Sequence, residues 1–333
     1  MNVFMIGGPG NISRGTVDSF LESGDELTVF TRNVEKKKVL YPGVRLIDGD
    51  RANIKQLSDA FITSKADIVI DTIGYHLDEA QTLYEIIKSR IKHFIFISTV
   101  DVYGYPLSRI PFRETDVFRP ATAGYAQTKL DIELFYQEKQ RMEGLPLTIG
   151  RPSLSIGPDF SPMMLFDWGF SVVPRIRAGL PILVPGDGLG LMHVGWSYDV
   201  GRMIARISGD TVSIGKTYTL SDSECITRDD YISLYTHIAG REVERVYIPQ
   251  NLVDRFEEDQ SLTKIDHLYK HNMAFSMDSF KNDFPDFQWL SLSSGVEEFI
   301  RVNDERGRFS LPVGESIEDR IIKKWKERLH NWQ

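Results

Sequence analysis

Short apolar runs recur at regular intervals through the first half of the chain, and they constrain the fold more than any other feature. Most of these runs are apolar along their whole length, as in VFMI, DIVID and FIFIS, and helical patterns such as 16–23 and 80–90 separate them. Strands of this kind are typical of a parallel sheet covered by helices on both faces. The alternation therefore predicts a doubly wound α/β domain. The predicted strands are Asn2–Ile6, Glu26–Thr31, Val44–Asp48, Asp67–Asp71, His93–Ser98 and Leu147–Arg151.

The pattern changes near Gly157. Residues 157–190 are rich in Gly and Pro, and they are followed by predicted helices at 197–207 and 228–239 and a predicted strand at 217–220. We expect residues 1–157 to form the doubly wound domain. Residues 158–333 are expected to form a smaller, mixed α/β C-terminal domain, with the part at about 199–220 returning to the core sheet.

The composition restricts the classes of partner and compartment. The net charge of −8 disfavours nucleic acid, because affinity for phosphates depends on Lys and Arg. Cys225 is the only cysteine, which excludes an internal disulfide and fits a reducing compartment. No apolar run approaches the ~20 residues that span a bilayer, and the first residues do not resemble a signal peptide. We therefore expect a cytoplasmic protein that has no membrane segment and no nucleic-acid partner.

A glycine-rich loop follows the first predicted strand. Gly7 and Gly10 occupy the first two positions of a Gly-x-x-Gly-x-x-Gly turn, and Ser13 occupies the third. Glycines there permit a tight turn and let backbone N–H groups approach a pyrophosphate at a helix N-terminus. We expect Gly7, Gly10, Asn11 and Ile12 to bind a dinucleotide on a Rossmann fold. The alternative is a structural turn that has no ligand.

The end of the second strand bears on the choice of cofactor. No acidic residue stands there to bind ribose hydroxyls, and Arg32 is placed to neutralise a 2′-phosphate, with Arg14 as a candidate to assist it. This favours NADP, with NAD still possible; alternatively, Arg32 is a solvated loop residue. The later strand ends supply the other expected cofactor residues, which are Asp50 and Arg51 beside the adenine, and Thr72 and Gly74 in the next turn.

A tyrosine and a lysine open a predicted helix in the segment YAQTK. Tyr125 and Lys129 are four residues apart and therefore lie on one helix face. An ammonium beside a phenol lowers the phenol pKa, which is ordinarily about 10. Such a tyrosine can exchange a proton with a hydroxyl while hydride moves to or from a nicotinamide. Thr99, at the end of the fifth strand, can bind the same substrate oxygen. The alternative is a surface aromatic residue and a solvated lysine.

The segments GGPGNIS, STVDVYG, YAQTK, RPSLSIGP and GDG…DV together resemble the extended short-chain dehydrogenase/reductase family, also called the NAD-dependent epimerase/dehydratase family. GNIS and HVGWSYDVG are most similar to its branch of chloroplast stem-loop-binding proteins, which is described both as epimerase-like and as RNA-binding. The resemblance implies that Tyr125 is the acid/base and that Thr99 is its hydroxyl partner. It further implies that Lys129 modulates Tyr125 and binds the nicotinamide ribose, with Pro152 and Ser153 near the nicotinamide.

The sequence departs from the family at positions that concern the substrate. Sugar 4,6-dehydratases follow the hydroxyl residue with Asp and Glu, where this chain has Val100 and Asp101. Asp101 is either a second base or an ordinary turn aspartate. Leu154 and Met192 stand where sugar-nucleotide enzymes carry an Asn and an Arg. Arg175 and Arg177 are candidates to replace those contacts, or they are solvated charges.

These observations predict an NAD(P)-dependent epimerase/dehydratase-type enzyme that acts on a secondary alcohol or ketone of a sugar or sugar-like substrate. The alternatives are an NADPH-dependent carbonyl reductase of the same fold and a non-catalytic RNA-binding or regulatory protein. His193 is isolated, and no metal site is expected. Tyr75, Trp168 and Trp196 either line a sugar pocket or belong to the core. A homodimer is also possible, through apolar residues at helical spacing that could equally be core: Leu83, Ile86, Ile87, Leu134 and Phe135.

Overall fold

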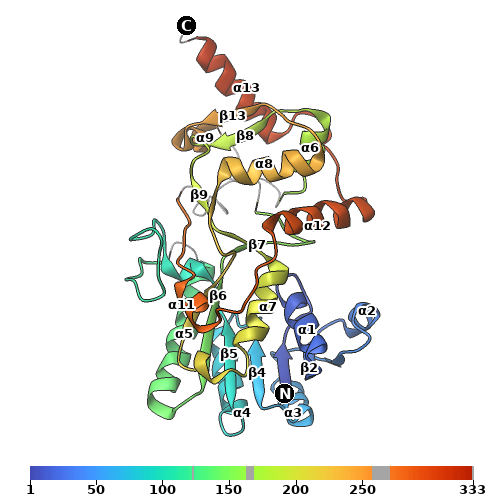
Figure 1. Cartoon of the computed structure of the whole chain (residues 1–333), viewed down its shortest axis with the longest axis vertical. Helices are drawn as coiled ribbons and strands as arrows, with labels where there is room; N and C mark the ends of the chain where they lie inside the picture. Colours follow the sequence, from blue (N-terminus) through green and yellow to red (C-terminus); the bar gives the residue numbers. More distant parts are fainter. Residues whose placement is uncertain (122–123, 163–168, 257–270, 332–333) are drawn as a thin grey trace.

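The computed structural model describes all residues except 122–123, 163–168, 257–270 and 332–333, so Trp168 lies outside the described residues (Figure 1). Seven parallel strands form the main sheet in the order β11-β6-β5-β4-β1-β2-β3. The predicted doubly wound α/β fold is therefore confirmed. The strands are β1 (Asn2–Ile6), β2 (Glu26–Thr31), β3 (Arg45–Asp48), β4 (Ile68–Asp71), β5 (His93–Ile97), β6 (Leu147–Pro152) and β11 (Thr217–Leu220).

Helices cover both faces of this sheet. Val3 and Met5 of β1 belong to one core cluster with α1 (Ser13–Glu22) and α7 (Ser197–Ile207). Phe4 and Ile6 point the other way, into a cluster with the remaining helices of this half. Burial on both faces explains why these strands are apolar throughout. The second group of helices comprises α3 (Ile54–Ser64), α4 (Leu77–Ile87) and α5 (Gly124–Glu143), while the short α2 (Val34–Leu40) follows β2.

Two glycines allow α1 and α7 to pack closely. A Cβ on Gly15 would lie 2.0 Å from the Tyr198 carbonyl oxygen, and a Cβ on Gly201 would lie 2.4 Å from the Ile12 carbonyl oxygen. The hydroxyl of Thr16 donates a hydrogen bond to the Gly201 carbonyl oxygen at 2.9 Å. The contact fixes the N-terminal end of α1, which carries the glycine-rich loop.

The C-terminal half is a smaller assembly above the main sheet in Figure 1, built around a separate apolar cluster. Three two-stranded sheets pair β7 (Leu154–Ile156) with β10 (Val194–Trp196), β9 (Leu191–Met192) with β12 (Ile226–Thr227), and β8 (Ile182–Pro185) with β13 (Arg245–Ile248). Its helices are α6 (Val172–Ala178), α8 (Arg228–Ala239), α9 (Gln250–Phe256), α12 (Leu292–Glu305) and α13 (Ile317–His330). The chain returns to the main sheet at α7 and β11, and again at α11 (Asp278–Asp283), which packs against β11.

The apolar residues considered for a dimer do not form one exposed face. Leu83 and Ile87 are fully buried within the subunit and pack in the core beneath α4. Ile86 and Phe135 are partly buried against the same core, whereas Leu134 is 55% exposed. Core packing within one chain therefore accounts for most of this set.

None of the helices described is both long enough and apolar enough to span a bilayer. Within the same part of the chain, His, Cys, Asp and Glu side chains form no cluster of three or more that could hold a metal ion.

Candidate active site

The glycine-rich loop joins β1 to α1 at the carboxyl edge of the sheet. Gly7 has a φ of 90°, and a Cβ there would lie 2.5 Å from Thr72 Oγ1, so the loop requires glycine at this position. A Cβ on Gly10 would meet only Ser13 Oγ, at 3.8 Å. Gly10 thus faces open space next to the N-terminus of α1, where the helix dipole favours an anion.

Asn11 and Ile12 connect this loop to neighbouring elements. Asn11 Oδ1 accepts a hydrogen bond from Ser197 Oγ at 3.5 Å, and it would lie 2.0 Å from a Cβ on Gly157. The carbonyl oxygen of Ile12 is the group that requires glycine at position 201. Both residues hold the loop against α7 and against the start of the C-terminal half, so they fix its shape through their own packing.

Two cationic side chains flank the loop at the end of β2. Arg32 is exposed, and Lys37 of α2 reaches back to donate a hydrogen bond to the Gly8 carbonyl oxygen at 2.9 Å. Lys37 also contacts Thr31 Oγ1. Burial and the nearby Arg32 lower the pKa of Lys37. Sequence analysis missed Lys37, because nothing in the run Lys36-Lys37-Lys38 shows which lysine turns inward.

Arg51, which the sequence analysis expected beside an adenine, forms a buried ion pair with Asp71. Its guanidinium is buried and binds both oxygens of Asp71, at 2.7 and 3.2 Å, with Glu79 2.9 Å from Nε. Asp50 is exposed, and its carboxylate accepts a hydrogen bond from the Ala52 N–H at 3.0 Å. Periodicity locates the ends of β3 and β4, but it does not show that Arg51 after β3 pairs with Asp71 at the end of β4.

Thr72 and Gly74 follow β4 on the same edge. The hydroxyl of Thr72 donates to the Ile6 carbonyl oxygen at 2.9 Å, which joins this turn to the end of β1. A Cβ on Gly74 would lie 2.8 Å from both Asp71 Oδ2 and the ring of Phe96. The turn therefore closes tightly over the ends of β4 and β5.

The other arginines considered as phosphate ligands have carboxylate partners. Arg14 forms a bidentate ion pair with Glu298 of α12, at 2.6 and 2.7 Å, and its guanidinium lies over the Tyr198 ring. Arg175 is buried against α13, and Arg177 pairs with α12; their partners are Glu318 and Asp319 for the first, and Asp304 for the second. These three side chains connect the elements of the fold to one another.

Lys129 lies beneath the carboxyl end of β5. It is 2% exposed, and its Nζ donates to the Ile97 carbonyl oxygen at 2.9 Å. The same nitrogen is 4.7 Å from the centroid of the Tyr75 ring and 5.1 Å from that of the Phe96 ring. The Tyr125 ring lies 6.3 Å from the Tyr75 ring and is 48% exposed. The site thus has a buried ammonium that faces two aromatic rings, and an accessible phenol.

Thr99 and Asp101 follow β5 in a short 3-10 helix, η1 (Val100–Tyr103). Thr99 Oγ1 accepts the Asp101 backbone N–H at 3.2 Å and so caps this helix. The Tyr105 hydroxyl donates to the Asp101 carboxylate at 3.5 Å. The adjacent hydroxyl of Ser98 is buried and forms no hydrogen bond within the part of the chain that the structure describes. An unsatisfied buried hydroxyl at this edge is available to a ligand.

The environment of these groups disfavours their charged forms. Burial lowers the pKa of Lys129 to about 8, although the Asp71 carboxylate opposes the shift. Burial likewise raises the pKa of Asp101 to about 6. The pKa of Tyr125 is raised by burial, and then by Tyr75 and Asp101, whereas the sequence analysis expected the Lys129 ammonium to lower it. Perturbed titratable groups concentrated at one strand edge are typical of a catalytic site.

Pro152 and Ser153 lie where β6 ends, beside β11. Pro152 is paired in register with Leu220, and Ser153 Oγ is 2.5 Å from Ser221 Oγ. Both side chains are buried. They form part of the floor of the carboxyl edge, one strand away from the end of β5.

The two remaining candidates from sequence analysis have hydrogen-bond partners within the fold. The Trp196 indole N–H donates to Glu298 at 3.0 Å, beside α12. His193 is buried, with Nδ1 accepting the Phe275 backbone N–H at 3.1 Å and Nε2 2.9 Å from the Asp222 carbonyl oxygen. Burial lowers the pKa of His193 to about 4, so it is a neutral structural residue.

A parallel sheet whose glycine-rich loop opens onto a Tyr-x-x-x-Lys helix defines a dinucleotide-dependent enzyme of the short-chain dehydrogenase/reductase class. The family model for the NAD-dependent epimerase/dehydratase family matches residues 3–220. The chain belongs to this family, as the motifs in its sequence indicated.

Relatives with known names include both epimerases and reductases. Chloroplast stem-loop binding protein of 41 kDa b from Arabidopsis thaliana is 23% identical over 63% of this chain and 55% of its own length. UDP-glucose 4-epimerase from Streptococcus mutans is 27% identical over 49% of this chain and 56% of its own length. The chain thus spans little more than half of these two proteins. Phenylcoumaran benzylic ether reductase POP1 from Populus trichocarpa is 24% identical over 90% of this chain and 99% of its length.

Solved structures share the fold at low identity. An epimerase from Methanothermobacter thermautotrophicus superposes with a TM-score of 0.72, at 16% identity and 92% coverage of both chains. dTDP-glucose 4,6-dehydratase from Bacillus anthracis, in complex with NAD, gives a TM-score of 0.71 at 19% identity, covering 92% of this chain and 97% of that one.

Proposed function

We propose that this protein transfers hydride between NADP and a secondary alcohol or ketone of a sugar-like substrate, as an epimerase or dehydratase. One observation carries the proposal: the half-exposed Tyr125 phenol stands one helical turn from the buried Lys129 ammonium, which is anchored at the end of β5. Thr99 and Asp101 follow that same strand. The group combines a proton-exchanging phenol, a cation and a hydroxyl at the edge where open α/β sheets bind ligands.

The described residues fit a dinucleotide. The open space at Gly10, the N-terminus of α1 and the unsatisfied Ser98 hydroxyl all lie along the carboxyl edge. Arg32 and Lys37 beside the loop favour a 2′-phosphate, and with it NADP over NAD. The dinucleotide, when bound, supplies the hydride donor or acceptor and, in its oxidised form, a positive charge near the reacting carbon.

The protein's own groups handle the proton. Tyr125 accepts the hydroxyl proton of an alcohol as the carbonyl forms, and it returns that proton when a carbonyl is reduced. A phenol is a poor base near neutral pH, and burial worsens this, so the Lys129 ammonium is needed to stabilise the phenolate. Thr99 donates a hydrogen bond to the same substrate oxygen. Asp101, close enough to influence Tyr125, supplies a second proton-accepting group for chemistry at a neighbouring carbon.

Analysis of retained small molecules tests this proposal. The purified protein is denatured, and the released compounds are identified by mass spectrometry, while fluorescence titration compares NADPH with NADH. A retained dinucleotide, with NADPH binding more tightly, is the expected result. A folded protein that neither retains nor binds a dinucleotide would rule out the proposed chemistry.

A net reduction of a carbonyl by NADPH is the second candidate. The relative matched over 99% of its length is named a reductase, and the arginines considered for a sugar diphosphate are paired elsewhere. A reductase turns over added NADPH steadily with a carbonyl substrate, whereas an epimerase or dehydratase shows no net consumption of the dinucleotide. Absorbance at the NADPH band during turnover separates the two.

A further inference from the structure

A buried ion pair between Arg51 and Asp71 lies near Lys129 of the candidate active site. The side chains are 7% and 0% exposed, and both guanidinium Nη atoms contact the carboxylate. Asp71 also accepts the Ile73 backbone N–H at 3.1 Å. Placing a charge pair in such a position costs solvation, which well-packed apolar side chains of similar volume would avoid. Stability alone therefore does not explain why this charge pair is buried here.

Asp71 is close to the elements that hold Lys129. It ends β4 and is paired in register with Phe96 of β5, whose ring lies beneath the Lys129 ammonium. Gly74 leaves so little room that a Cβ there would touch both the Asp71 carboxylate and the Phe96 ring. The Asp71 carboxylate and the Phe96 ring thus both border Gly74, and the same ring faces the Lys129 ammonium.

Several charged and titratable groups face Lys129 from the elements around it. Asp71 raises the pKa of Lys129, and Arg51 lowers it, so the two members of the pair act in opposite directions. Glu133, one turn further along α5, also raises this pKa, but its carboxylate is held by Arg151 at 2.5 and 2.9 Å. The Tyr75 ring covers the ammonium from the loop after β4.

We propose that Arg51 and Asp71 are positioning residues, which set the protonation of Lys129 by presenting it with a carboxylate whose charge is largely compensated. This inference rests on the proposed role of Lys129 in the reaction. A lone carboxylate at Asp71 would hold the lysine charged at all working pH values. A lone guanidinium would drive it towards the neutral amine. With both members of the pair present, Lys129 can carry its proton in the free protein and can still change its protonation when a ligand binds.

The test follows the protonation of Lys129 directly, without a substrate. Protein labelled with ¹³C at the lysine ε-carbons is titrated by NMR, and the Lys129 signal is assigned by its loss in Lys129→Arg. Asp71→Asn should lower the titration midpoint of Lys129 by about one pH unit, because a nearby opposite charge is removed. Arg51 keeps Glu79 as a counter-charge in this variant, which favours folding.

The double variant Arg51→Met/Asp71→Asn removes both charges and should bring the midpoint back towards the wild-type value. A purely structural role would not produce opposite shifts from two charge removals. Glu79→Gln is the matched control: it weakens the same buried cluster but leaves the Arg51–Asp71 pair, and it should not move the midpoint.

The inference is overturned if folded Asp71→Asn titrates like the wild type, or if the second substitution does not reverse its shift. Dinucleotide binding measured over the same pH range should follow the midpoint in each variant. If the midpoints move as expected while no dinucleotide binds, the proposed function fails and the role of the pair stands. If a dinucleotide binds while the midpoints stay fixed, the reverse holds.

Discussion

The two edges of the main sheet treat charge in opposite ways. At the carboxyl edge, burial lowers the pKa of Lys129 to about 8 and raises that of Asp101 to about 6. At the amino edge, acidic groups are held charged. Burial raises the pKa of Asp25, but hydrogen bonds from the N-terminal ammonium and the Ser23 hydroxyl outweigh this effect and keep the pKa low. A hydrogen bond from the Val212 backbone N–H likewise lowers the pKa of Asp210.

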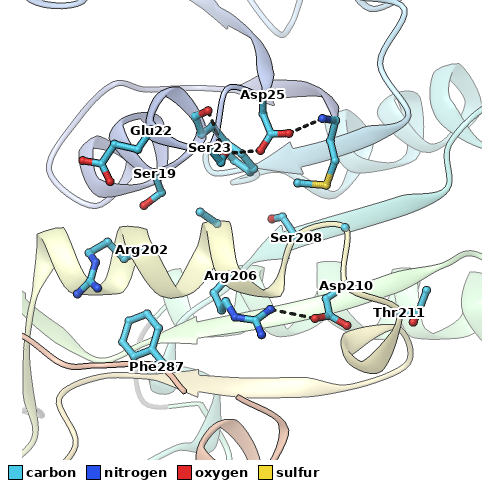
Figure 2. Close-up of a pocket in the computed structure, with 14 residues that line it drawn as sticks. Ser19, Glu22, Ser23, Asp25, Arg202, Arg206, Ser208, Asp210, Thr211 and Phe287 are labelled. Atoms are coloured by element: carbon cyan, nitrogen blue, oxygen red, sulfur yellow. Dashed lines mark hydrogen bonds and ion pairs between the residues drawn. The ribbon is translucent and has the colours of Figure 1, made fainter. Parts of the chain in front are cut away.

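The amino edge also contains a pocket of about 770 Å³ between α1 and α7 (Figure 2). Asp25 there contacts the N-terminal ammonium, and Arg206 binds Asp210 at 2.9 Å. Groups whose charged form is stabilised by a partner are typical of structural ion pairs, whereas groups whose charged form is destabilised are typical of a site for proton transfer. The direction of the pKa shifts therefore indicates the candidate active site better than the presence of a pocket does.

Among the variants at the two edges, Tyr125→Phe should cause the largest loss of turnover. Losing the phenol hydroxyl should reduce turnover by ~10²–10⁴-fold, the usual range for general acid/base help. Dinucleotide binding should remain, because the ring is kept. The matched control is Tyr247→Phe, which removes a tyrosine hydroxyl at similar exposure from the C-terminal half. Steady-state turnover of the identified substrate is the measurement, and near wild-type rates for Tyr125→Phe would eliminate this residue as the acid/base.

Gly10→Val should weaken dinucleotide binding by about tenfold or more, because each lost 1.4 kcal/mol of binding free energy is a factor of ten. A side chain there enters open space over the N-terminus of α1, so the fold should tolerate it. Gly43→Val, in the exposed connection before β3, is the control, since a Cβ there meets only Leu21 at 3.8 Å. Fluorescence titration with NADPH gives both affinities. Equal affinity in the two folded variants would move the cofactor away from this loop.

Lys37→Ala and Arg32→Ala should each reduce the preference for NADPH over NADH by about tenfold, which is about 1.4 kcal/mol of lost attraction to a 2′-phosphate. Lys37 is the more informative variant, because it is already held at the loop through the Gly8 carbonyl oxygen. Lys36→Ala is the control on the same helix, where the side chain is exposed. Affinities for both dinucleotides are compared in each variant, and an unchanged ratio would leave the preference unexplained by these cations.

The sequence predicted the fold more completely than the site. The β1, β2 and β11 bounds and those of α7 and α8 agree with the predicted ranges, because apolar periodicity is a local property. Pairing of side chains between distant segments is not local. The sequence analysis therefore did not find the pairing of Arg51 with Asp71 or that of Arg14 with Glu298.

Lys37 and Asp71 also show that sequence analysis does not detect contacts between distant segments. Neither was singled out by the sequence analysis, although Lys37 contacts Gly8 in the glycine-rich loop and Asp71 contacts Arg51. Lys37 is one of three consecutive lysines, and Asp71 ends an apolar strand in the way many aspartates do. Their contacts form only in the folded structure. There, α2 brings Lys37 to the glycine-rich loop, and Arg51, which follows β3, reaches Asp71 at the end of β4.

Asp101→Asn should produce a smaller loss of turnover, of a few-fold, at pH values above about 6, where the wild-type carboxylate is ionised. As a base, Asp101 must be ionised, so its activity limb rises through a pKa of about 6 and disappears in the variant. Its pKa is higher in the folded protein than in the unfolded chain, so the folded state binds more protons between about pH 4 and 6, and stability falls as pH rises through that window. Melting temperatures at pH 4.5 and 7 should therefore differ less in Asp101→Asn. An unchanged acidic limb would assign it to another group.

The smallest effect is expected at the amino edge, from Arg206→Met. The substitution removes the ion pairs with Asp210 and Asp286 but keeps an apolar side chain against the Phe284 ring. Partly exposed ion pairs contribute about 0–1 kcal/mol, so the free energy of unfolding should fall by no more than that. Turnover and dinucleotide affinity should stay at wild-type values, since this pocket lies across the sheet from Tyr125 and Lys129. Chemical denaturation and steady-state kinetics measure the two quantities on the same preparation. A clear loss of turnover without a matching loss of stability would give the amino edge a functional role and undo the contrast between the edges.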